Sequence, residues 1–159
     1  MKTKYIGFDQ SSKVVGYAVM DGNSLISYGQ YIVPNTSCLM ERVDSIIGFV
    51  DELVNAHGKD DLIIGFEDTQ ESRMNTNTFQ LLTKVLGILE FWAYCNNIEY
   101  KVLHVSSWRK HAGIKGKRRE EKKANAIKKV QEKFGNAGEF QVSEDAAEAI
   151  LITDYLRSL

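Results

Sequence analysis

Three short segments rich in β-branched and aromatic residues lie almost end to end at the start of the chain, and their spacing narrows the possible folds most. They span residues 4–9 (KYIGFD), 14–20 (VVGYAVM) and 24–33 (SLISYGQYIV). Asp21-Gly22-Asn23, between the last two, favours a tight hairpin turn. Strands joined by such short connections pair antiparallel with their chain neighbours. The sequence therefore predicts an antiparallel meander of three strands.

Helical and strand patterns alternate after this meander. Apolar residues recur at helical spacing over residues 39–57, and Gly58 follows as a stop signal. Residues 62–67 (LIIGFE) are almost wholly apolar, which is typical of a buried strand parallel to the first. Further along we expect a loop over 68–77, a helix over 78–96, a strand over 99–105, a short helix from Trp108 capped by Ser106 or Ser107, a basic helix over 118–134, and a final helix over 144–157 behind Ser143. This order predicts an α/β fold, with a mixed sheet (antiparallel meander plus parallel strands) flanked by helices.

Length and composition suit one domain over residues 1–159. Hydrophobic residues make up 43% and charged residues 26%, as in ordinary soluble domains. No apolar run approaches the roughly 18 residues of a membrane-spanning helix, and the N-terminus lacks a signal-peptide pattern. Cys38 and Cys95 form no metal-type pair. We therefore expect a cytoplasmic protein of a bacterial cell with reduced thiols and no membrane partner.

Basic residues are concentrated in one segment. Residues 109–133 hold eleven Lys/Arg against three Glu, a local net charge of +8, while the rest of the chain carries −9. A basic face of this kind neutralises phosphates and releases counterions, whereas a merely solvated helix would pair its lysines with acids at i,i+4. The segment holds too few acids for such pairing, so nucleic-acid contact is the favoured interpretation.

Four acidic residues stand where they can form one cluster. Asp9 and Glu67 each follow Gly-Phe at the end of a predicted strand, and sites in such sheets lie beyond the strands' carboxyl ends. Asp145 and Glu148 are three apart and share one face of the last predicted helix, although acids there could also simply favour the helix dipole. Glu144 should point elsewhere. Four carboxylates without His or Cys suit Mg²⁺, with Mn²⁺ able to substitute, and two such ions can hydrolyse a phosphodiester.

These motifs resemble those of the RuvC-type Holliday junction resolvases. GFDQSSKVVGYAVM is similar to the family's first motif, GFEDTQ to its second, and SEDAAEAILI to its C-terminal acid pair. Gln10-Ser11 replaces the usual Pro-Gly, and Thr69-Gln70 replaces an aromatic residue, which makes the chain more similar to a divergent, phage-type branch. The resemblance implies an RNase H-like fold, a homodimer, and paired Mg²⁺-dependent nicking of four-way DNA junctions.

The resemblance also implies roles for particular residues. By motif match, Asp9, Glu67, Asp145 and Glu148 would be the metal ligands, and Lys123 would lie near the scissile phosphate. The DNA-binding residues would come from the basic segment: Lys115, Lys117, Arg118, Arg119, Lys122 and Lys123. The long apolar helix over 78–96, with Phe79, Leu82, Leu86, Leu89 and Trp92, could place one stripe on the sheet and another on a twin subunit.

Other readings and residues stay open at this stage. The same fold could act on flaps or RNA–DNA hybrids, the chain could bind junctions without cutting them, and an actin-like phosphotransferase would need a second domain. Trp108 is expected to pack beneath the basic segment rather than stack on a base. His104 is expected to be a core residue in a strand. His111 could contact phosphate, and Arg73 and Asn75 could reach a junction centre.

Overall fold

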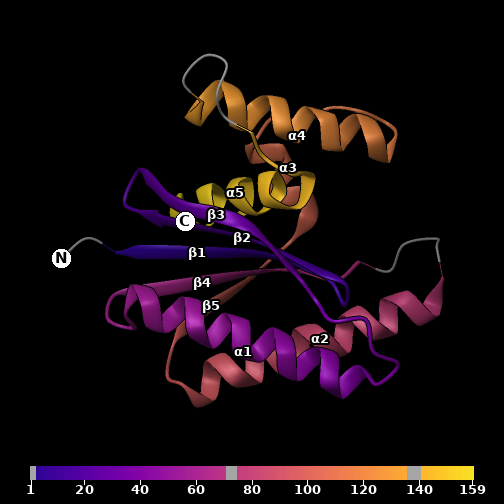
Figure 1. The fold of residues 1–159 in the computed structure, drawn as a ribbon. Coiled ribbons are helices and arrows are strands. Elements are labelled where there is room, and N and C mark those ends of the chain that lie inside the picture. Colours follow the sequence, from indigo (N-terminus) through magenta and orange to yellow (C-terminus); the bar gives the residue numbers. More distant parts are fainter. Residues whose placement is uncertain (1–2, 71–74, 136–140) are drawn as a thin grey trace.

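A computed structural model describes residues 3–70, 75–135 and 141–159. In these residues a five-stranded sheet lies between two layers of helices (Figure 1). The strands are β1 (Lys4–Gln10), β2 (Val14–Asp21), β3 (Ser24–Ile32), β4 (Leu62–Glu67) and β5 (Glu99–Leu103). The helices are α1 (Leu39–His57), α2 (Thr76–Cys95), α3 (Val105–His111), α4 (Arg119–Phe134) and α5 (Glu144–Arg157).

The strand order β3-β2-β1-β4-β5 combines both kinds of pairing. β1 and β3 each pair antiparallel with β2, so the predicted meander is confirmed. β4 pairs parallel with β1 and with β5, so the predicted parallel strand is confirmed as well. The fold is therefore α/β with a mixed sheet, as the order of the sequence patterns predicts.

Side chains alternate between two cores on the two faces of the sheet. On β1, Ile6 and Phe8 are fully buried and pack with α1 and α2. Gly7, between them, faces α5, where an added Cβ would lie 2.3 Å from Oγ1 of Thr153. β4 alternates in the same way. Because side chains alternate with a period of two, Asp9 and Glu67 lie on the α5 face of the sheet. Figure 1 shows α3, α4 and α5 on that side and α1 and α2 on the other.

The predictions for the segment around residue 104 were wrong. The predicted strand 99–105 ends at Leu103, and α3 begins at Val105, not Trp108. His104 is exposed and is not a core residue. Its ring nitrogen Nδ1 accepts the backbone N–H of Ser106, so His104 caps α3 in place of Ser106 or Ser107. The reason is that Val105 is buried in the core as the first residue of α3 and not as a residue of β5, so an apolar side chain here does not indicate that the strand continues.

The remaining boundaries lie close to those predicted. α2 begins at Thr76, two residues before the expected helix, and the side chain of Asn75 caps it. α1, α4 and α5 lie within one residue of their expected limits. Of the helices that the described ranges contain, none is both long and apolar enough to cross a membrane.

Candidate active site: a cavity lined by acidic and basic side chains

Asp9 and Glu67 lie side by side because of the strand register. β1 and β4 pair up to Phe8 and Phe66, and Asp9 and Glu67 are the next residues of the two strands. On its other side, Asp9 pairs with Gly16 of β2. Two carboxylates separated by 58 positions in the chain thus share one end of the sheet.

Gly16 lets the start of α5 lie directly on the sheet. A Cβ at this position would lie 2.2 Å from the carbonyl oxygen of Asp145, closer than real contacts allow. α5 begins behind Ser143, whose hydroxyl accepts the N–H of Ala146. This close approach brings Asp145 next to Asp9, the register partner of Gly16. Glu148 follows one turn later and is 7% exposed.

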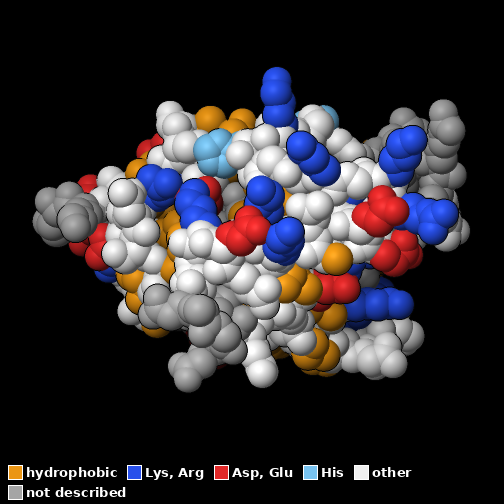
Figure 2. All heavy atoms as spheres, turned by 90° about the horizontal axis from the view of Figure 1, so that it is seen from above, with side chains coloured by type: hydrophobic (Ala, Val, Ile, Leu, Met, Phe, Trp, Pro, Cys, Tyr) orange, Lys and Arg blue, Asp and Glu red, His pale blue; other side chains and the backbone are white. Residues whose placement is uncertain are grey.

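One cavity of about 720 Å³ brings the predicted acids and several cations together. Its acidic lining residues are Asp9, Glu67, Asp145 and Glu148. Its basic lining residues are Arg109, Lys117, Arg119, Lys122 and Lys123. Figure 2, seen from above, shows Lys and Arg side chains gathered across the face that carries α4, with acidic side chains among them. A cavity with acids and cations on its walls can take up an anionic substrate together with cations.

Burial and the neighbouring carboxylates raise the pKa of Asp9 and of Glu67. Burial, and then the negative charges of Glu67, Glu148 and Asp145, raise the pKa of Asp9 well above its usual range. Burial, followed by the charge of Glu148, raises the pKa of Glu67 to about 7, although hydrogen bonds to its carboxylate oppose the shift. Carboxylates that repel one another in this way are stabilised by a bound cation.

Two residues of α3 donate hydrogen bonds to these acids. The indole N–H of Trp108 donates to Oε1 of Glu67 at 2.8 Å. The guanidinium of Arg109 donates to Oε1 of Glu148 at 3.2 Å and lies 5.1 Å from the centre of the Trp108 ring. Trp108 is fully buried, so the expected packing role is confirmed. α3 therefore holds two of the four carboxylates in place.

The donor set fits a hard divalent cation, but no closed coordination shell exists as the side chains stand. Within residues 3–70, 75–135 and 141–159, no three His, Cys, Asp or Glu side chains are arranged to hold a metal ion. Two of the carboxylates that line the cavity each accept a hydrogen bond at one oxygen, Glu67 from Trp108 and Glu148 from Arg109. Four carboxylates at one cavity wall, two of them (Asp9 and Glu67) with raised pKa values, have the chemistry that Mg²⁺ or Mn²⁺ requires.

The basic residues predicted to bind DNA divide into two groups. Lys117, Arg119, Lys122 and Lys123 line the cavity, whereas Lys115 and Arg118 are exposed outside its lining. Lys123 donates to the carboxylate of Glu144 at 2.6 Å. Burial alone would lower the pKa of Lys123, but the bond to Glu144 and the nearby acids raise it. Glu144 lies outside the cavity lining, as its place on the helix predicts.

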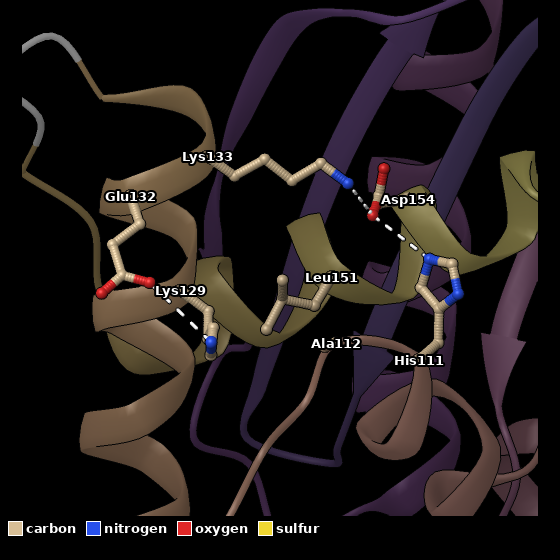
Figure 3. A pocket seen from close by; sticks show the side chains of 7 residues that line it. All are labelled: His111, Ala112, Lys129, Glu132, Lys133, Leu151 and Asp154. Carbon is tan, nitrogen blue, oxygen red and sulfur yellow. Dashed lines mark hydrogen bonds and ion pairs between the residues drawn. The ribbon is translucent and has the colours of Figure 1, made fainter.

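A second pocket, of about 320 Å³, lies against the later turns of α5 (Figure 3). Its charged groups are paired: the buried Asp154 accepts from Lys133 at 2.5 Å and lies 3.4 Å from His111, and Lys129 lies 3.8 Å from Glu132. His111 thus faces Asp154 and does not line the larger cavity.

The sequence did not indicate the contacts that three residues make with the acids of the site. Gln10, Trp108 and Arg109 all touch the acids or their backbone. Gln10 carries a usable signal, since it is a polar residue on the buried face of a strand and must therefore find a partner. For the α3 residues no comparable signal exists. Asn75 caps α2, and Arg73 lies outside the described residues.

Comparison with known proteins supports the fold. No protein-family model matches the chain, and no curated protein matches its sequence. Two solved structures match it: RuvC from Thermus thermophilus, and T. thermophilus RuvC in complex with a Holliday junction substrate. Their TM-scores are 0.74 and 0.73 and their identities 14% and 15%; the matches cover 96% of this chain and 92% and 91% of those chains. The chain therefore has the RuvC, RNase H-like fold.

Proposed function

We propose that this chain is a divalent-metal-dependent endonuclease that nicks four-way or otherwise branched DNA. The observation that carries the proposal is the cavity in which four carboxylates from three elements stand beside basic side chains. The fold is that of T. thermophilus RuvC, which has been solved with a Holliday junction substrate. Acids alone would suit a metal-binding module, and cations alone a nucleic-acid-binding one. The two together suit phosphodiester hydrolysis.

In this proposal Asp9, Glu67, Asp145 and Glu148 hold Mg²⁺, two ions per site, with Mn²⁺ able to substitute. When bound, such ions lower the pKa of an attacking water and stabilise the charge on the leaving oxygen. The chain's own residues position the DNA. Lys117, Arg119, Lys122 and Lys123 bind backbone phosphates along the cavity, and Lys123 takes the place nearest the scissile phosphate.

The proposal includes a homodimer formed through α2. Leu86 and Leu89 of this helix are buried within the chain, so that stripe belongs to the core. Phe91 and Tyr94, three residues apart, are 67% and 72% exposed and form a separate aromatic face. A two-fold pair would place one site on each of two strands, as matched nicks require. Analytical ultracentrifugation at micromolar concentration tests the dimer. If the wild-type chain and the Phe91→Glu variant both sediment as monomers, the dimer is refuted.

The test is a cleavage assay on four labelled substrates: a four-way junction, a flap, an RNA–DNA hybrid and plain duplex, each with Mg²⁺ and with EDTA. We expect Mg²⁺-dependent nicks that favour the four-way junction. Cleavage confined to the flap or hybrid would keep the nuclease chemistry and discard the junction preference. Junction binding that survives EDTA, with no nicking in Mg²⁺, would show a binding module instead of an enzyme.

A further inference from the structure

The only polar group of the Trp108 side chain, its indole N–H, donates a hydrogen bond to Glu67. The side chain of Trp108 is fully buried and belongs to the core between α3, α4 and α5. The indole N–H points at Oε1 of Glu67, 2.8 Å away. A buried N–H without an acceptor costs free energy, so the indole and the carboxylate fix each other's orientation. Through this bond, the core that α3 forms with α4 and α5 is connected to Glu67, the last residue of β4.

The side chain of Gln10 makes two hydrogen bonds with the backbone of Glu67. Its side-chain amide donates to the carbonyl oxygen of Glu67 at 2.6 Å, and its Oε1 accepts the N–H of Glu67 at 3.2 Å. Gln10 is 8% exposed. The register between β1 and β4 ends at Phe8 and Phe66, just before this point. The amide of Gln10 therefore extends the ladder by one step, in the way a backbone peptide group would.

The two contacts together leave Glu67 little freedom. Gln10 holds its main chain, and Trp108 holds its carboxylate. These contacts come from β1 and α3, elements that are far apart in the chain, yet they meet on a single residue. Burial requires that the polar groups of Gln10 and Trp108 each have a hydrogen-bond partner. It does not require that both residues find that partner on Glu67.

We propose that Gln10 and Trp108 are positioning residues that together hold Glu67 ready to bind the divalent cation. The proposal rests on the metal-dependent function above. Residues that orient a ligand from behind change metal affinity about 10- to 100-fold when they are replaced. Trp108 does not line the cavity, and both polar groups of the Gln10 side chain bond to the backbone of Glu67, so in this proposal both residues act through Glu67.

The chain has two tryptophans, which makes the test spectroscopic. A Trp92→Phe variant leaves Trp108 as the sole tryptophan, and titration with Mg²⁺ should change its fluorescence saturably when tryptophan is excited selectively. Trp108→Phe leaves only Trp92, half-buried on α2, whose emission should not respond. Mn²⁺ affinity, measured by calorimetry without DNA, should fall about 10- to 100-fold in Trp108→Phe and in Gln10→Met.

Two control variants separate the possible results. Ile64→Val, on the opposite face of β4, is expected to lower stability without changing Mn²⁺ affinity. If the proposed function holds, the Asp145→Asn variant should bind Mn²⁺ more weakly than the wild-type chain does. If the wild-type chain binds no Mn²⁺, the proposed function fails and this inference fails with it. If it binds Mn²⁺ through Asp145, but Trp108→Phe and Gln10→Met bind as tightly as wild type, the positioning role is refuted and the nuclease proposal stands.

Discussion

Replacing Gly16 by alanine should separate the parts of the candidate site. The new Cβ would lie 2.2 Å from the carbonyl oxygen of Asp145 and 2.6 Å from its carbonyl carbon. Ordinary contact begins at 3.4 Å, so the start of α5 must retreat by about 1 Å. The obstacle is backbone, which cannot rotate aside like a side chain. The retreat would carry Asp145 away from Asp9.

We expect Gly16→Ala to lower the free energy of unfolding by about 1–3 kcal/mol, the usual cost of overpacking. A misplacement of about 1 Å should slow nicking about 100-fold. Urea unfolding in EDTA measures the first effect, and single-turnover cleavage of a labelled junction in Mg²⁺ measures the second.

Gly48→Ala is the matched control. Gly48 lies in α1, and nothing lies within 4 Å of a Cβ added there. In a helix, this change should stabilise the chain by up to about 1 kcal/mol and leave nicking unchanged. If Gly16→Ala were as stable and as active as wild type, the close packing of α5 on β2 would not be what assembles the site.

Two further predictions concern charge. Burial alone would raise the pKa of Asp154, but the hydrogen bonds from Lys133 and then Arg157 hold this pKa below its ordinary value. The ionised Asp154 therefore stabilises the fold fully above about pH 3.8, the pKa of the unfolded chain. This stabilisation is lost as the pH falls through the lower pKa of the folded state. Asp154→Asn should therefore cost about 1.5–3 kcal/mol in urea unfolding at pH 7 and much less at pH 2, and an equal loss at both would contradict this. Arg119→Ala and Lys122→Ala should each weaken junction binding at all sequences and reduce the slope of log affinity against log salt by about 0.9, and an unchanged slope would remove those residues from the phosphate contacts.

Much of the fold follows from local patterns in the sequence. The short connections of the first three strands require an antiparallel meander, and the apolar run before Glu67 requires a buried strand. Period-two alternation then places Asp9 and Glu67 on the same face of the sheet. Helical spacing places Asp145 and Glu148 on one side of α5. The convergence of all four on one cavity follows from these patterns once α5 packs on that face.

The contacts that hold the acids could not be read from the sequence. β5 ends at Leu103 and His104 caps α3, whereas the apolar pattern around His104 predicts that the strand continues. Where α3 lies depends on the packing of Trp108 in the core, a long-range effect that no local pattern reports. The partners of Arg109 and Gln10 depend on that packing and on the strand register. Among the predicted DNA-binding residues, the division between those inside and outside the cavity is likewise a tertiary property.

In the proposed function, the acid-lined cavity cuts branched DNA with the help of a divalent cation. The most direct test is nicking of a labelled four-way junction by the wild-type chain, by Asp145→Asn and by Asp44→Asn, an exposed acid of α1 on the other face of the sheet. Paired nicks in Mg²⁺ from the wild type and Asp44→Asn, lost in EDTA and in Asp145→Asn, are the predicted result. Equal nicking by Asp145→Asn, or nicking that persists in EDTA, would contradict the claim.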